Sequence, residues 1–105
     1  MKSHPFTGPL KELITKAQAG NANDIDFIMS KLTIDSCFAT TRFVDYALSL
    51  VENSKGISRI KFYLFNGTLI QRNYASLFFN RRGDWKYVKA ALDEGLIDEL
   101  QAYSR

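Results

Sequence analysis

The sequence predicts an all-α protein built from antiparallel helical hairpins. Apolar residues recur at intervals of three and four along most of the chain, as on one face of a helix. Gly and Pro are few, six and two in 105 residues, which suits helices joined by short turns. Runs of alternating apolar and polar residues are too short to predict a strand. Hydrophobic residues make up 46% of the chain, enough for a packed core.

The first two helices are predicted from residue 8 onward. Gly8-Pro9 opens the first helix, because proline is favoured at an early helical position, and Gly20-Asn21 ends it. Asn23 is expected to cap the second helix, with Asp24 and Asp26 in its first turn, where carboxylates favour the helix dipole. The predicted apolar face of the second helix contains Ile25, Ile28, Met29 and Leu32.

A third and a fourth helix are predicted in the middle of the chain. Asp35 or Ser36 is expected to cap the third helix, which ends in the segment 53–56, and Cys37 is expected to be a small core residue. The fourth helix is expected to begin near Ile57. Because apolar groups surround most of it, we expect it to be central and buried.

Three further helices are predicted in the last third. Thr68 is expected to cap the fifth helix and Gly83 to end it. Asp84 is expected to cap the sixth, Gly95 to follow it, and a seventh to span residues 96–103. The predicted inner face of the fifth helix contains Ile70, Tyr74, Leu77 and Phe78.

Six or seven helices with two- to five-residue turns predict antiparallel neighbours. They would form either a short α-solenoid-like stack or a compact orthogonal bundle. At this length we expect one domain over residues 1–105, with residues 1–7 as a flexible N-terminal tail.

A short internal similarity joins the segments 24–32 and 84–92. Both have an acidic residue first, an aromatic fourth, a β-branched fifth and a leucine ninth. This indicates either two hairpins built on one plan, as in an α-solenoid, or the chance similarity of two amphipathic helices.

The segment 83–95 resembles the second helix of an ankyrin repeat in the spacing of its glycines, Val88 and Leu92. The Thr-Pro-Leu-His turn of that family is absent before it, and the preceding helix carries Phe78-Phe79 where the family has small alanines. The helix pairs are more similar to HEAT- and armadillo-type repeats. That resemblance implies a binding scaffold.

The charge of the chain is unevenly distributed. Residues 53–92 carry only one acidic side chain, Asp84. Such a basic band favours an acidic partner or a phosphate backbone, or it forms a solvated face. The band contains Lys55, Arg59, Lys61, Arg72, Arg81, Arg82, Lys86 and Lys89.

No constellation for catalysis or metal binding is found. His4 and Cys37 are the only residues of their types, whereas a metal site recruits several such ligands. The acidic pairs are chain neighbours or lie at helix ends, where capping explains them. Asn66-Gly67-Thr68 fits the glycosylation pattern, but we interpret it as a helix end in the left-handed conformation. We therefore expect no enzymatic activity and no cofactor.

We also expect a cytoplasmic protein. A single cysteine permits no intrachain disulfide, which fits a reducing compartment. No apolar run follows the N-terminal residues, as a secretory signal would require. No run is long enough to span a membrane.

The main functional hypothesis is a protein-interaction or scaffold domain with an acidic protein partner. Amides and arginines along one edge of the fifth helix could bind a partner, or could form a polar seam that satisfies loop carbonyls. Apolar exposed ends would also allow a homodimer. The predicted partner-binding residues are Arg72, Asn73, Asn80, Arg81, Arg82 and Lys86.

Two other functions remain open from the sequence. The first is nucleic-acid binding by the basic band between Lys55 and Lys89. The second is an enzyme or small-ligand sensor, which would need a pocket. Candidate lining residues for such a pocket are Gln71, Asn73, Tyr74 and Trp85.

Overall fold

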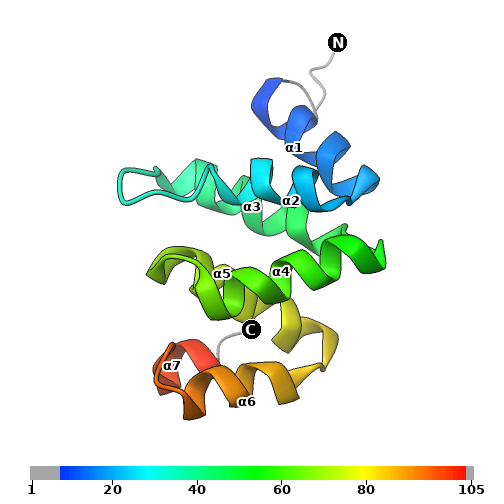
Figure 1. Cartoon of the computed structure of the whole chain (residues 1–105). Helices are drawn as coiled ribbons and strands as arrows, with labels where there is room; N and C mark the ends of the chain where they lie inside the picture. The colour runs from blue at the N-terminus through cyan, green and yellow to red at the C-terminus, as the bar shows by residue number, and fades with distance from the viewer. Residues whose placement is uncertain (1–7, 104–105) are drawn as a thin grey trace. The chain divides into compact units, whose positions relative to one another are not determined.

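A computed structural model describes residues 8–103, and the secondary-structure elements in this range are all helices. The predicted all-α class is therefore confirmed. The predicted tail, residues 1–7, lies outside the described residues. The helices are α1 (Gly8–Ala19), α2 (Ala22–Met29), α3 (Phe38–Ser49), α4 (Ser54–Asn66), α5 (Leu69–Arg82), α6 (Trp85–Asp93) and α7 (Glu99–Ala102) (Figure 1).

The chain divides into two compact units, Met1–Arg59 and Ile60–Arg105. The division falls within α4, so the first turns of this helix belong to the first unit and the remainder to the second. The single domain over residues 1–105 stays a prediction.

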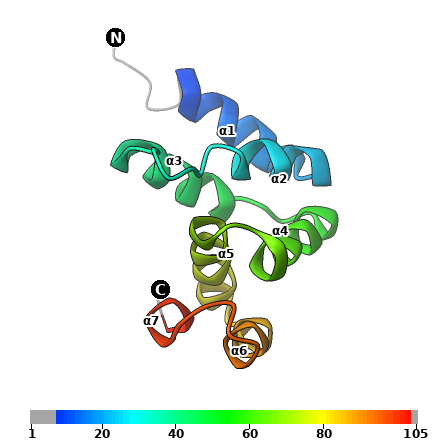
Figure 2. The ribbon, with the colours of Figure 1, turned by 60° about the vertical axis from the view of Figure 1, so that its left-hand side comes forward.

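The first unit is built on α1, α2 and α3, which pack against one another (Figure 2). The predicted inner face of α2 is confirmed, since its apolar residues and the leucine that follows the helix are at most 2% exposed. Burial of several such side chains, each worth about 1.5–3 kcal/mol, holds the three helices together. The core residues of α1 and α2 with this leucine are Leu13, Ile14, Ala17, Ile25, Ile28, Met29 and Leu32.

The start of α2 differs from the prediction. Asn21, not Asn23, is the N-cap residue, and its backbone N–H donates to the carboxylate of Asp24 at 3.0 Å. Gly20 adopts a positive φ of 65°, a conformation that glycine reaches without steric cost. The chain therefore turns immediately after α1, and the second helix begins two residues earlier than predicted.

The connection before α3 is longer than predicted and moves the helix start. It spans residues 30–37, and Cys37 rather than Asp35 or Ser36 is the N-cap residue. The Ser36 hydroxyl donates to the Lys31 carbonyl at 2.6 Å and accepts from the Thr33 N–H at 2.8 Å. Because these bonds occupy the hydroxyl within the loop, it does not cap the helix.

Cys37 and Phe38 lie on the surface, with the Phe38 side chain 76% exposed. The prediction that Cys37 is a core residue is therefore wrong. The buried face of α3 begins at Thr41 and includes Val44 and Leu48. The first turn of α3 projects beyond the part of the helix that is covered.

Asn53 caps the start of α4 and does not end α3, contrary to prediction. Its side-chain oxygen accepts from the Lys55 N–H at 3.0 Å, and its side-chain nitrogen donates to the Ala19 carbonyl at 3.2 Å. The helix consequently starts at Ser54, three residues before the predicted Ile57.

The prediction that α4 is central and buried holds for one face only. Ile60 and Leu64 are fully buried, as expected for residues four apart on one face. Lys61 is exposed and the Phe62 side chain is 42% exposed. The aromatic residues widen the apolar surface beyond the face that its neighbours cover.

In the second unit, α5 packs against α6 and α7. Thr68 caps α5 as predicted: its hydroxyl accepts from the Gln71 N–H at 3.3 Å, and the Gln71 side chain accepts from the Thr68 N–H at 2.9 Å. Gly83 and Gly95 have φ values of 78° and 75°, so the predicted left-handed glycines after α5 and α6 are confirmed. Asp84 is the N-cap residue of α6, also as predicted.

The inner face of α5 is rotated from the predicted one. Of the four predicted residues, only Phe78 is buried, and Phe79 beside it is fully buried. Small residues fill the rest of this face, because Ala75 and Ser76 are both fully buried. Ile70, Tyr74 and Leu77 are only partly covered.

The last helix is shorter than predicted. Helix α7 begins after Asp98, whose carboxylate accepts from the Gln101 N–H at 2.8 Å. This cap places the start of the helix three residues later than the predicted Leu96. Leu100 is 84% exposed and Tyr103 is 63% exposed, whereas Ile97 is buried.

The end of α4 lacks the predicted left-handed residue, since neither Asn66 nor Gly67 has a positive φ. Steric crowding, and not a left-handed backbone, explains why position 67 is a glycine. A Cβ atom at Gly67 would lie 2.7 Å from the Tyr63 carbonyl oxygen and 2.9 Å from the Gln71 Cβ atom. Any larger residue would push the two helices apart at this turn.

The two acidic residues that align in the internal similarity have different roles. Asp24 is the third residue of α2 and binds the N–H of its cap, whereas Asp84 is itself a cap. The Asp84 side chain forms an ion pair with Arg82 at 3.5 Å and makes no capping hydrogen bond. The two segments therefore enter their helices at different positions.

Replacement of Gly56 by alanine is expected to destabilise the protein. A Cβ atom there would overlap the Gly20 carbonyl oxygen and lie 2.9 Å from Val51 Cγ1. We expect the free energy of unfolding in urea to fall by about 1–3 kcal/mol, although alanine favours an isolated helix by about 1 kcal/mol over glycine. Ser58→Ala, at an exposed position of α4, should change it by less than about 0.5 kcal/mol. A Gly56→Ala variant as stable as the parent would contradict this close contact.

Candidate binding surfaces

Two of the predicted partner-binding residues are used within the second unit. Arg72 Nη1 donates to the Leu96 carbonyl oxygen at 3.1 Å, and Asn80 Nδ2 donates to the Ala102 carbonyl oxygen at 2.8 Å. Both side chains are half-buried. This arrangement matches the polar seam that the sequence offered as the alternative to a binding edge.

The other predicted binding residues are spread over α5 and α6. Asn73 is half-buried, while Arg81, Arg82 and Lys86 are exposed. The Arg82 guanidinium pairs with Asp84 at 3.5 Å and lies over the Phe78 ring. The structure thus separates the predicted edge into residues that hold the unit together and residues that face solvent.

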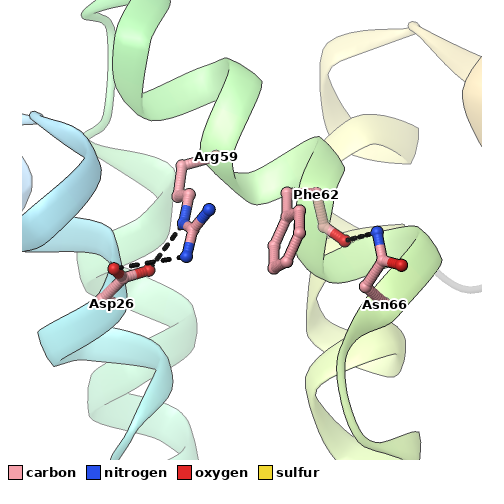
Figure 3. A network of polar contacts seen from close by, with 4 residues as sticks. All are labelled: Asp26, Arg59, Phe62 and Asn66. Atoms are coloured by element: carbon pink, nitrogen blue, oxygen red, sulfur yellow. Dashed lines mark hydrogen bonds and ion pairs between the residues drawn. The ribbon is translucent and has the colours of Figure 1, made fainter.

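One member of the basic band in the first unit is neutralised. Arg59 Nε donates to Asp26 Oδ1 at 2.7 Å and its Nη2 to Asp26 Oδ2 at 3.4 Å (Figure 3). This two-point ion pair joins α2 to the first part of α4. Figure 3 also shows that the Asn66 side chain donates to the Phe62 carbonyl at 3.1 Å, within α4.

The first unit has an apolar groove between α1 and α3 that the sequence analysis missed. We call it the α3 groove, and its volume is about 420 Å³. Most of its lining is apolar, and the Phe38 and Tyr46 side chains within it are 76% and 45% exposed. Its lining residues are Leu10, Phe38, Ala39, Arg42, Phe43 and Tyr46.

A signal for this groove was present in the sequence. Phe38, Arg42 and Tyr46 are four residues apart, so they form a second stripe along α3. The buried stripe of Thr41, Val44 and Leu48 fixes the opposite side of the helix, and the second stripe therefore faces outward. The Arg42 guanidinium lies 5.5 Å from the centre of the Phe38 ring, which places a positive charge at the edge of the groove.

The second unit has a cluster of cationic groups around one aromatic ring. Lys61 Nζ lies 4.3 Å from the centre of the Tyr87 ring, and Lys86 Nζ lies 5.1 Å from it. We call Lys61, Lys86 and Tyr87 the lysine–tyrosine cluster. Helices α4 and α6 supply its members, so sequence spacing alone could not reveal it.

A smaller apolar pocket of about 130 Å³ lies at the α6 and α7 side of the second unit. Of the residues suggested for a small-ligand site, Trp85 contributes to it, whereas Gln71, Asn73 and Tyr74 do not. Its lining residues are Trp85, Val88, Lys89, Leu92, Ala102 and Tyr103.

The thiol of Cys37 is exposed and free. Its sulfur lies 3.3 Å from the Thr40 hydroxyl oxygen. This hydrogen bond, together with the Thr40 backbone N–H, lowers the pKa of Cys37 below its usual value. Within residues 8–103, no group of three His, Cys, Asp or Glu side chains is arranged to hold a metal ion, and His4 lies outside this range.

Comparisons with models of protein families, with curated protein sequences and with solved structures find no match for this chain. Over the described range, the helices are too short or too polar to cross a lipid bilayer.

The Asn80 hydrogen bond predicts a measurable contribution to stability. Asn80→Ala removes the donor to the Ala102 carbonyl, and we expect the free energy of unfolding to fall by about 1 kcal/mol. Amide hydrogen exchange should also accelerate in residues 99–102. Asn73→Ala, in the same helix, is the matched control and should leave exchange in α7 unchanged. Equal amide exchange rates of residues 99–102 in the two variants would contradict the structural role of Asn80.

The Thr40 hydroxyl is expected to control the reactivity of Cys37. Thr40→Val removes the hydroxyl with little change in shape, so the pKa of Cys37 should rise and less thiolate should be present at any pH below it. Iodoacetamide alkylation, followed by mass spectrometry across a pH series, should therefore shift to higher pH. An unshifted profile would show that this hydrogen bond does not stabilise the thiolate.

Proposed function

We propose that this protein is an interaction module that binds an amphipathic helix of another protein in the α3 groove. The observation that carries this proposal is the uncovered stripe of Phe38, Arg42 and Tyr46 beside Leu10. No catalytic role is proposed for it, in keeping with the function expected from the sequence. The binding surface differs from the predicted arginine edge of α5.

The exposure of the stripe supports a docking role. A large apolar patch on a small domain is typical of a binding site, whereas single exposed apolar residues are common. Phe38 and Tyr46 lie two helical turns apart with Phe43 between them, and Ile34 in the preceding loop is 97% exposed. This clustering over residues 34–46 favours a continuous contact surface.

The shape and charge of the groove favour one kind of partner. A groove along a helix accepts the apolar face of a second helix, which contacts it through residues spaced three and four apart. Arg42 at the edge favours a partner that carries Asp or Glu beside its apolar anchors, because the guanidinium can bind a carboxylate at two points. The acidic partner predicted from the sequence is thus retained, with Arg42 as its contact.

The exposed thiol of Cys37 favours one cellular compartment for this protein. A free, exposed Cys37 with a lowered pKa would oxidise readily outside a reducing environment. We therefore place this interaction in the cytoplasm.

A display library of helical peptides would test the proposal. We expect selection against the chain to enrich peptides with bulky apolar residues at helical spacing next to Asp or Glu. Phe38→Asp should lower the affinity for an enriched peptide by about tenfold or more, as for a central interface residue. Arg42→Glu should lower the affinity for acidic peptides. The same variant should bind more tightly to peptides whose acidic residue is replaced by lysine.

Leu69→Asp is the matched control, since Leu69 is 66% exposed and lies outside the groove. Its peptide affinity should equal that of the parent, and circular dichroism should show that all variants remain helical. Peptides that bind Phe38→Asp as tightly as the parent would disprove the proposal. So would self-association in analytical ultracentrifugation that disappears in Phe38→Asp, because a second copy would then occupy the groove.

A further inference from the structure

The lysine–tyrosine cluster brings two positive charges close to one aromatic ring. Lys61 and Lys86 form no ion pair within residues 8–103. The neighbouring cations of this unit differ, because Lys89 pairs with Asp93 at 3.2 Å and Arg82 with Asp84 at 3.5 Å. Two like charges near each other repel, and an anion between or beside them relieves this repulsion.

The Tyr87 ring, to which both lysines lie close, is itself held in place. Its centre lies 5.4 Å from that of Phe79, in an edge-on arrangement, and Phe79 is fully buried. The ring is therefore anchored to the core of the second unit. The Tyr87 hydroxyl makes no hydrogen bond within the described part of the chain, so this side chain offers a donor in addition to the two ammonium groups. These three groups suit a phosphate oxygen.

An exposed aromatic side chain adjoins each lysine in the chain. Phe62 follows Lys61 and is 42% exposed, and Trp85 precedes Lys86 and is 52% exposed. Basic groups interleaved with exposed aromatic rings are typical of surfaces that bind single strands, where phosphates meet the cations and unpaired bases stack on the rings. A duplex hides the faces of its bases, and a phosphopeptide has no base to stack.

From these observations we propose that the second unit binds single-stranded nucleic acid. Lys61, Lys86 and the Tyr87 hydroxyl contact the phosphates, and Phe62 and Trp85 stack on bases. This site shares no residue with the α3 groove, so its test is independent of the test of the proposed function. The proposed site uses only part of the predicted basic band, because Arg59 and Arg72 form hydrogen bonds within their own units.

Fluorescence anisotropy with labelled 12-nucleotide oligouridine would test this site in the full chain. We expect binding at low salt that weakens linearly in log salt concentration. Lys61→Gln with Lys86→Gln should reduce the slope of that line by about 1.4, since each phosphate contact on a single strand contributes about 0.7. Phe62→Ala and Trp85→Ala should each weaken binding by about fivefold or more at constant slope, because a stacking contact is lost.

The first unit offers a matched control. Lys16 and Lys31 also share one aromatic ring, with distances of 5.2 and 4.5 Å to the centre of Phe27. This ring carries no hydroxyl group, and Lys16 lies 4.0 Å from Asp24. Lys16→Gln with Lys31→Gln removes the same charge and should leave binding almost unchanged.

Several results would overturn the proposal. Absence of binding at low salt would do so, and so would equal weakening by the control pair, which would indicate general charge attraction. Equal affinity for a duplex of the same length, or for polyphosphate, would show that stacking plays no part. Helical circular dichroism spectra of all variants would separate these results from unfolding.

Discussion

The close approach of Gly20 and Gly56 determines how the first unit is assembled. Only glycine at position 56 leaves room for the Gly20 carbonyl, and Gly20 itself needs its positive φ to turn the chain from α1 into α2. Asn53 completes the junction, because it binds the Ala19 carbonyl and caps α4 at the same time. The ends of α1 and the starts of α2 and α4 therefore meet at one place, and α3 packs against the pair that this junction orients.

The second unit is held together by hydrogen bonds from side chains of α5 to backbone carbonyls. Its last helix is a single turn, far too short to be stable alone. Arg72 and Asn80 of α5 each hold one carbonyl of the C-terminal segment, at Leu96 and Ala102. Buried Ile97 adds apolar contact between these two points. Polar side chains that suggest a binding edge in the sequence thus replace the regular packing that a longer helix would provide.

Two surfaces of different chemistry are not used by these structural roles. The α3 groove in the first unit is apolar with a single arginine at its edge, which suits a protein helix. The lysine–tyrosine cluster in the second unit provides positive charge, and an exposed aromatic ring is the chain neighbour of each lysine, which suits a single strand. Each surface is anchored to a buried side of its own unit: the groove through the inner stripe of α3, and the cluster through Phe79.

The sequence by itself determined the features that depend on neighbouring residues. The helical class, the Thr68 cap and the left-handed glycines at positions 83 and 95 were predictable, because local hydrogen bonds and backbone sterics decide them. Tertiary structure decided the rest. Ser36 failed as a cap because its hydroxyl was used in a loop, and Cys37 was exposed because it precedes the part of α3 that is buried, which begins at Thr41. The approach of Lys61 and Lys86 to the same ring required contacts between residues distant in the chain, and the spacing of residues along a sequence carries no such information.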